Sequence, residues 1–185
     1  VVVLSGRRRG LGGLWRHFLV VIDLLMCGRR LGAVFLFFAA RVVRRFGVGG
    51  PADIIFSPFD EDDLVHFLAG CPNEIPLFTI GAGSNLLVRD GGITGVVIKL
   101  STHMKQITHD DTCITAQTGA TDADVARYAQ KVGIANLEFL IGIPGTIGGG
   151  LRMNAGAYGS EFRDITIRAH GFDRDGNRIS ATPTD

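Results

Sequence analysis

Cysteine is scarce in this chain, and the positions of the few cysteines exclude two common kinds of site. The sequence has three, Cys27, Cys71 and Cys113, an odd number with wide spacing. No CxxC motif and no cluster of cysteine with histidine is present. The pattern argues against a zinc site and a disulfide framework, and it favours a reducing compartment.

Long apolar runs are also lacking. A helix that spans a membrane needs about 20 consecutive, mostly apolar residues. The best candidates lie in the first quarter of the chain, where Asp23 interrupts residues 18–27 and Arg29 and Arg30 precede residues 31–40. Each run is therefore too short, and we expect no membrane partner.

Negative charge is nearly absent from residues 1–45, which carry nine arginines, no lysine and one acid, a net charge of +8. Residues 46–185 carry ten basic and seventeen acidic residues, a net charge of −7. We therefore expect residues 1–45 to be an Arg-rich leader outside the fold. A membrane anchor, a presequence and a non-native leader remain alternative interpretations of this segment. The anchor interpretation leaves open a membrane-associated interaction protein.

Glycine is abundant, with 26 residues, and it is concentrated in Leu137–Glu161. This stretch includes the run Gly148-Gly149-Gly150. Each glycine inside a helix costs about 0.5–1 kcal/mol relative to alanine. The density therefore predicts a loop that bends sharply or approaches a ligand closely.

A second glycine stretch, residues 81–85, follows the predicted strand Leu77–Ile80 and reads GAGSN. Successive backbone N–H groups in such a turn form a concavity that binds phosphate. The stretch is not the dinucleotide fingerprint, because it lacks the third glycine and no helical pattern follows it.

The remaining elements are short and mixed, which indicates an α/β or α+β protein. Helices are predicted after Asp60, closing at Gly70, and from a cap at Thr121 or Asp122 to Lys131, closing at Gly133. Strands are predicted at residues 54–56, 95–100, 104–108, 113–118, 165–172 and 178–181.

Three acidic groups have a metal-binding interpretation, but each also suits a local structural role. Residues 60–63 fit the first turn of a helix. Residues 109–111 fit the tip of a hairpin, and the Asp-Gly pair within residues 173–177 is a hairpin signal. We favour the structural interpretation for all three, and we expect no metal.

Three blocks of residues 46–185 resemble the UDP-N-acetylenolpyruvoylglucosamine reductase family. They read FGVGGPAD (46–53), GAGSNLLVRDGGITGVVIKL (81–100) and LEFLIGIPGTIGGGLRMNAGAYGSE (137–161). The resemblance implies an α+β FAD-binding domain of the p-cresol methylhydroxylase/vanillyl-alcohol oxidase type. Residues 46–100 would form its first subdomain and residues 101–185 a truncated second subdomain. The family's C-terminal substrate domain would be absent.

The resemblance also implies the cofactor site. The FAD pyrophosphate would lie against Gly81, Ala82, Gly83, Ser84 and Asn85. The ribityl chain and isoalloxazine would lie along Ile143, Pro144, Gly145, Thr146, Gly148, Gly149, Asn154, Gly156, Ala157 and Tyr158.

The reaction of this family is a step of peptidoglycan synthesis in the bacterial cytoplasm, and it thereby supports cell shape and cell division. NADPH reduces FAD, which then reduces UDP-N-acetylglucosamine-enolpyruvate to UDP-N-acetylmuramate. A serine supplies a proton, and an arginine and a glutamate stabilise the intermediate. None of the three has a counterpart before Asp185; Arg152, Arg163 and Arg168 lack the family's catalytic context. We therefore expect this chain to be inactive alone. We also expect it to bind no nucleic acid. The alternative is an FAD- or nucleotide-binding module without redox chemistry of its own.

Overall fold

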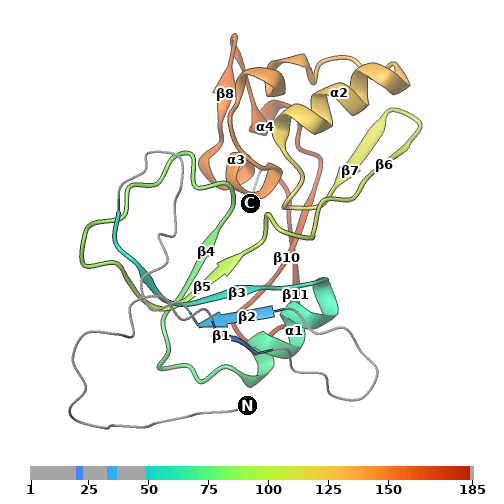
Figure 1. Ribbon diagram of the computed structural model, residues 1–185. Helices are drawn as coiled ribbons and strands as arrows, with labels where there is room; N and C mark the ends of the chain where they lie inside the picture. The colour runs from blue at the N-terminus through green and yellow to red at the C-terminus, as the bar shows by residue number, and fades with distance from the viewer. Residues whose placement is uncertain (1–19, 23–32, 37–48, 184–185) are drawn as a thin grey trace, which may run out of the picture.

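The first lobe of the molecule is built on a five-stranded sheet (Figure 1). The computed structural model describes residues 20–22, 33–36 and 49–183. The sheet order is β1-β2-β3-β5-β4, with β1 Val20–Ile22, β2 Ala33–Leu36, β3 Ala52–Ser57, β5 Ile93–Lys99 and β4 Leu77–Ile80. The strands β3, β5 and β4 are parallel; β2 pairs antiparallel with β3, and β1 pairs antiparallel with β2.

The central strand β5 explains why this sheet is stable. Val96, Val97 and Ile98 are all buried, as expected for a parallel strand covered on both faces. Val97 packs on one face with Ile55 and Ile80. Its neighbours Val96 and Ile98 point to the other face, where helix α1 (Glu61–Gly70) covers them with Leu64 and Leu68.

Two strands of the sheet, β1 and β2, lie within residues 1–45, which we expected to stand apart from the fold. The strand β2 pairs with β3, with Val34 opposite Phe56, and β1 pairs with β2. Without β2, the strand β3 would be an edge strand with unpaired backbone groups, which β2 satisfies. The rest of residues 1–45 lies outside the described residues.

The acidic residues 60–63 begin a helix, as predicted. Asp60 is the N-cap of α1, and its side chain accepts a hydrogen bond of 2.9 Å from the backbone N–H of Asp63. Glu61, Asp62 and Asp63 lie in the first turn, where negative charge is favourable.

The second lobe surrounds a separate core. Its elements are β6 Ile107–Asp110, β7 Cys113–Ala116, α2 Asp122–Val132, the 3₁₀ helix η1 Glu138–Gly142, α3 Ile147–Met153, β8 Gly156–Ala157, β9 Ser160–Glu161 and α4 Phe162–Ile165. Val125 and Ala126 of α2 pack against Phe139, Leu140 and Phe162. The predicted helix is confirmed, because Thr121 caps α2 and Gly133 ends it in the left-handed conformation.

Two predicted hairpins have different bounds in the structure. The turn expected at residues 109–111 begins later, because His109 lies within β6 and is paired with Ile114. The strand expected to begin at Ile165 is β10, Ala169–Phe172, because residues 162–165 form the helical turn α4. Glu161 and Asp164 form a capping box that starts this turn.

The last hairpin, β10 with β11 (Arg178–Ala181), returns from the second lobe to the first (Figure 1). Phe172 packs onto the apolar cluster beneath α1. The guanidinium of Arg174 donates to the carbonyl oxygens of Pro72 at 2.6 Å and Ile75 at 2.9 Å. The division into two subdomains at residue 100 stays a prediction. The hairpin belongs to the predicted second subdomain and packs against the first.

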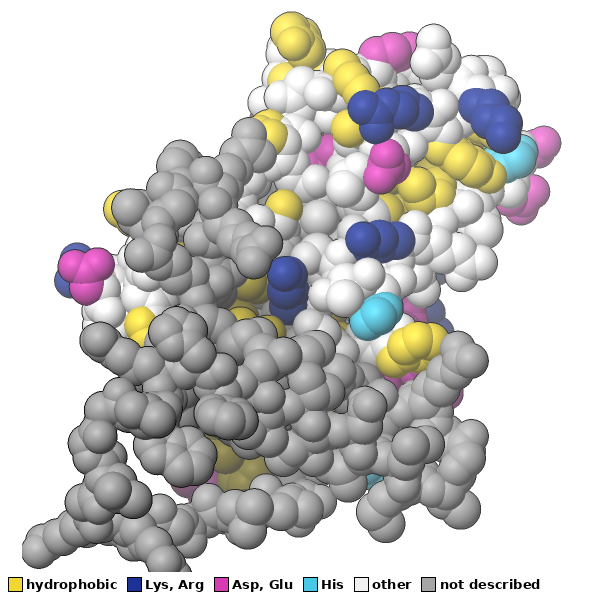
Figure 2. Space-filling model, in the orientation of Figure 1, with side chains coloured by type: hydrophobic (Ala, Val, Ile, Leu, Met, Phe, Trp, Pro, Cys, Tyr) yellow, Lys and Arg dark blue, Asp and Glu magenta, His cyan; other side chains and the backbone are white. Residues whose placement is uncertain are grey.

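Basic and acidic side chains are interspersed on the surface. On the face in Figure 2, the described Lys and Arg side chains stand apart from one another among acidic, apolar and neutral groups. Within the described ranges, no helix has both the length and the apolar character to cross a membrane.

Candidate functional site

The candidate site lies where the two glycine stretches meet, one from each lobe. Gly81 directly follows β4, and Thr146 is the residue before α3. A Cβ atom on Gly81 would collide with the hydroxyl of Thr146. The close approach of the two lobes at this point therefore requires glycine.

A second contact between the stretches involves Gly145. A Cβ atom there would lie 2.7 Å from Oδ2 of Asp122 and 3.8 Å from Oγ of Ser84. The backbone N–H of Asp122 also donates to the carbonyl oxygen of Gly145 at 3.3 Å. The turn before α3 is thus held between the start of α2 and the first lobe.

The loop after β4 contains a glycine in the left-handed conformation and backbone N–H groups without a backbone acceptor among the described residues. Gly83 has φ of 70°, a left-handed conformation that favours glycine. Within the described part of the chain, the N–H groups of residues 82–85 donate to no backbone carbonyl. Successive N–H groups of this kind are suited to phosphate oxygens.

Two polar side chains at this junction are buried without a hydrogen-bond partner among the described residues. They are Thr146, through its hydroxyl, and Asp122, through both carboxyl oxygens. Their exposed fractions are 2% and 0%. Leaving such a group unsatisfied costs about 1–3 kcal/mol. Both groups are therefore suited to form hydrogen bonds when a ligand fills the site.

Burial also changes the acidity of Asp122. Desolvation raises the pKa of its carboxyl group from 3.8 to about 7. The sequence suggested only a helix-capping role for this residue. Its pattern, an acid at the start of a helix, does not distinguish an exposed capping residue from a buried one.

The glycine run is helical, which corrects the prediction that residues 148–150 form a loop. Residues 147–153 form α3, and Asn154 ends it in the left-handed conformation. A Cβ atom on Gly148 would collide with the hydroxyl of Thr118, and one on Gly150 would collide with the ring of Phe162. Tight packing on both sides therefore overrides the poor helix propensity of glycine.

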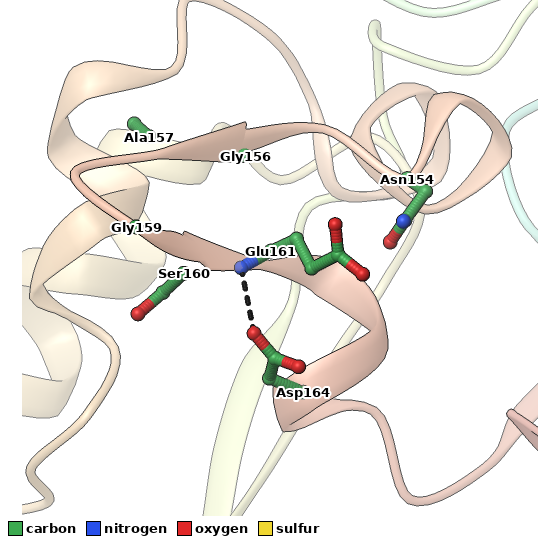
Figure 3. Close-up of a pocket in the computed structure, with 7 residues that line it drawn as sticks. All are labelled: Asn154, Gly156, Ala157, Gly159, Ser160, Glu161 and Asp164. Atoms are coloured by element: carbon green, nitrogen blue, oxygen red, sulfur yellow. Dashed lines mark hydrogen bonds between the residues drawn. The ribbon is translucent and has the colours of Figure 1, made fainter.

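The later residues of the predicted site lie in a separate hollow around the β8–β9 hairpin (Figure 3). Asn154, Gly156 and Ala157 line it, together with Gly159, Ser160, Glu161 and Asp164. None of residues 81–85 or 143–149 lines this hollow. Tyr158 is 84% exposed, and its ring lies against Gly142.

The junction has two features that suit a polar ligand. Among the described residues, the N–H groups of residues 82–85 donate to no backbone carbonyl, and the side chains of Thr146 and Asp122 are buried without hydrogen-bond partners. The family described as "FAD binding domain" matches residues 52–182. The chain belongs to this FAD-binding family.

Individual relatives agree with the family match and with the predicted resemblance. The chain is 51% identical over 140 residues to the UDP-N-acetylenolpyruvoylglucosamine reductase of Parvibaculum lavamentivorans, a match that covers 76% of this chain and 45% of that protein. It thus spans less than half the length of this curated relative.

Solved structures support the fold. The UDP-N-acetylenolpyruvylglucosamine reductase of Thermus caldophilus has a TM-score of 0.64 and 31% identity, covering 79% of this chain and 53% of that one. The 6-hydroxy-D-nicotine oxidase of Arthrobacter nicotinovorans has a TM-score of 0.57 and 19% identity, covering 74% and 31%, which shows the fold alone. The predicted α+β fold of the p-cresol methylhydroxylase/vanillyl-alcohol oxidase type is confirmed.

Proposed function

We propose that the chain binds FAD between its two lobes and forms the flavin-binding part of a bacterial UDP-N-acetylenolpyruvoylglucosamine reductase. The observation that carries the proposal is the junction of the two glycine stretches, where Gly81 abuts Thr146 and Gly145 lies between Asp122 and Ser84. The FAD-binding family match and the identity to named reductases support it.

The residues would divide the work of holding the cofactor. The N–H groups of Gly81, Ala82, Gly83, Ser84 and Asn85 would bind the pyrophosphate. The segment from Ile143 through Pro144, Gly145 and Thr146 to Gly148 and Gly149 would lie along the ribityl chain and the ring. Asn154, Gly156, Ala157 and Tyr158 would border the ring on the β8 side. Bound FAD supplies the capacity to accept a hydride and pass it on.

In a full-length reductase of this kind, NADPH would be the reductant and UDP-N-acetylglucosamine-enolpyruvate the acceptor, in the cytoplasmic synthesis of peptidoglycan precursors. The chain's own residues would bind and orient FAD and shield one side of it from water. Orientation of two reactants is worth as much as about 7–11 kcal/mol in favourable cases. We therefore do not expect the 185-residue chain alone to oxidise NADPH with this acceptor.

A matched pair of glycine variants tests the phosphate-binding loop. Gly83 and Gly133 have nearly equal φ angles, 70° and 75°, so a valine at either position suffers similar backbone strain. Gly133 ends α2, and a Cβ atom added there would have no other atom within 4 Å outside its own helix and chain neighbours. We expect Gly83→Val to weaken FAD binding at least tenfold and Gly133→Val to leave it unchanged.

Binding is measured by quenching of flavin fluorescence, and folding by circular dichroism. Unchanged affinity in a folded Gly83→Val protein contradicts the proposed loop. Binding that persists while the remaining portion of a related reductase, added separately, restores no turnover would favour the alternative of a binding module without redox chemistry.

A further inference from the structure

We infer that Asp122 positions the turn Ile143–Thr146 for the flavin and that it does so as a neutral carboxylic acid. The inference rests on the proposed FAD site and adds a residue to it. Asp122 belongs to neither glycine stretch, and its expected role was limited to capping a helix.

The contacts of Asp122 place it behind the turn. It is the first residue of α2, its backbone N–H donates to the carbonyl of Gly145, and its Oδ2 faces the Cα of the same residue. Ser84 of the first lobe also borders Gly145. A shift of the carboxyl group would therefore move the backbone that lies between the lobes.

The surroundings of Asp122 favour the neutral form. Its side chain is fully buried, and neither carboxyl oxygen has a partner among the described residues. Residues 81–85 and 143–149 contain no titratable side chain. On α2 itself, Asp124 and Arg127 are paired with each other at 3.1 Å on the exposed side. Burial alone accounts for the raised pKa, with no charged group contributing to it.

The protonation state of Asp122 has a direct consequence for an anionic cofactor. A neutral acid can donate one hydrogen bond and presents no charge to a pyrophosphate. An ionised carboxylate in the same place repels the anion and must itself be solvated, which disturbs the turn. FAD binding should therefore favour the protonated form and take up a proton above about pH 7.

The test measures the dissociation constant for FAD between pH 6 and pH 8.5 with the full 185-residue chain. We expect the wild-type protein to bind about thirtyfold more weakly at pH 8.5 than at pH 6, since one linked proton changes affinity by up to tenfold per pH unit above about pH 7. Asp122→Asn should match the wild type at pH 6 and keep that affinity at pH 8.5. Asp124→Asn, an exposed acid on the same helix, should follow the wild type.

The controls separate positioning from a general structural role. Asp122→Ala removes the hydrogen-bonding group, and we expect weaker binding at every pH in a protein that is folded by circular dichroism. Wild-type binding by Asp122→Ala, or a wild-type pH profile in Asp122→Asn, overturns the inference and leaves the flavin site standing. Failure of the folded wild type to bind FAD at pH 6 overturns both proposals.

A measurement on the wild type alone covers the case in which the variants do not fold. Calorimetric titration with FAD at pH 7.5, in two buffers of different ionisation enthalpy, counts the protons taken up. We expect uptake of a substantial fraction of one proton. Zero uptake contradicts a neutral Asp122 in the complex.

Discussion

Asp122→Asn should stabilise the protein at neutral and alkaline pH, even without FAD. The buried carboxyl group has a pKa of about 7 in the folded protein, compared with 3.8 as its ordinary value. The folded state keeps the proton across this range while the unfolded chain releases it. Folding therefore binds protons, and the stability of the wild type falls as pH rises from about 4 to about 7.

The magnitude follows from the separation of the two pKa values. Each pKa unit corresponds to 1.36 kcal/mol, so a separation of about three units is worth about 4 kcal/mol in full. About 3 kcal/mol of this loss falls between pH 5 and pH 8. Asparagine has the same shape but cannot ionise, so the variant should escape this loss.

Urea unfolding of the FAD-depleted proteins at pH 5, 6.5 and 8 measures the effect. We expect the wild-type midpoint to fall with pH relative to Asp122→Asn, with equal m values. Asp124→Asn serves as the control, because its side chain is exposed and its pair with Arg127 is worth at most about 1 kcal/mol. Parallel pH profiles for the wild type and Asp122→Asn would refute the reasoning.

Three further predictions concern the framework around the site. Gly150→Ala should lower stability by about 1–3 kcal/mol because the added Cβ atom would collide with the buried ring of Phe162. Gly149→Ala, whose Cβ atom would have only one contact, at 3.5 Å, should not lower it. Urea unfolding midpoints compare the two variants. Arg174→Ala should lower stability by about 1–3 kcal/mol through the loss of two hydrogen bonds to backbone carbonyls, and the exposed Arg178→Ala should be neutral. Deletion of residues 1–45 should leave FAD binding intact but lower the thermal midpoint, because it removes β1 and β2 from the sheet edge; loss of binding by a folded remainder would contradict this.

Elements with strong local signals were predictable from the sequence. The strand Leu77–Ile80 has the predicted bounds, and α2 begins and ends at its predicted caps, Thr121 and Gly133. Both depend on short-range signals, the flanking Pro76 and Gly81 in one case and capping residues in the other. The two glycine stretches were likewise identifiable, and the structure brings Gly81 and Thr146 into contact.

Features that depend on distant neighbours could not be predicted. The helical conformation of residues 148–150 depends on contacts with Thr118 and Phe162, which are remote in sequence. The burial of Asp122 depends on the turn at Gly145, more than twenty residues later. Local propensity contains neither piece of information, so tertiary packing overrode it in both cases.

The glycines of α3 and the loop after β4 thus serve two different purposes. Gly148 and Gly150 let the helix pack closely within the second lobe, where side chains would meet Thr118 and Phe162. Gly81 and Gly145 instead lie where the lobes meet, against Thr146 and Asp122, whose side-chain oxygens have no hydrogen-bond partner in the part of the chain that the structure describes. Only the second pair borders polar atoms that lack partners among the described residues, so substitutions there should alter cofactor affinity, while Gly150→Ala, outside the proposed flavin site, should alter stability alone.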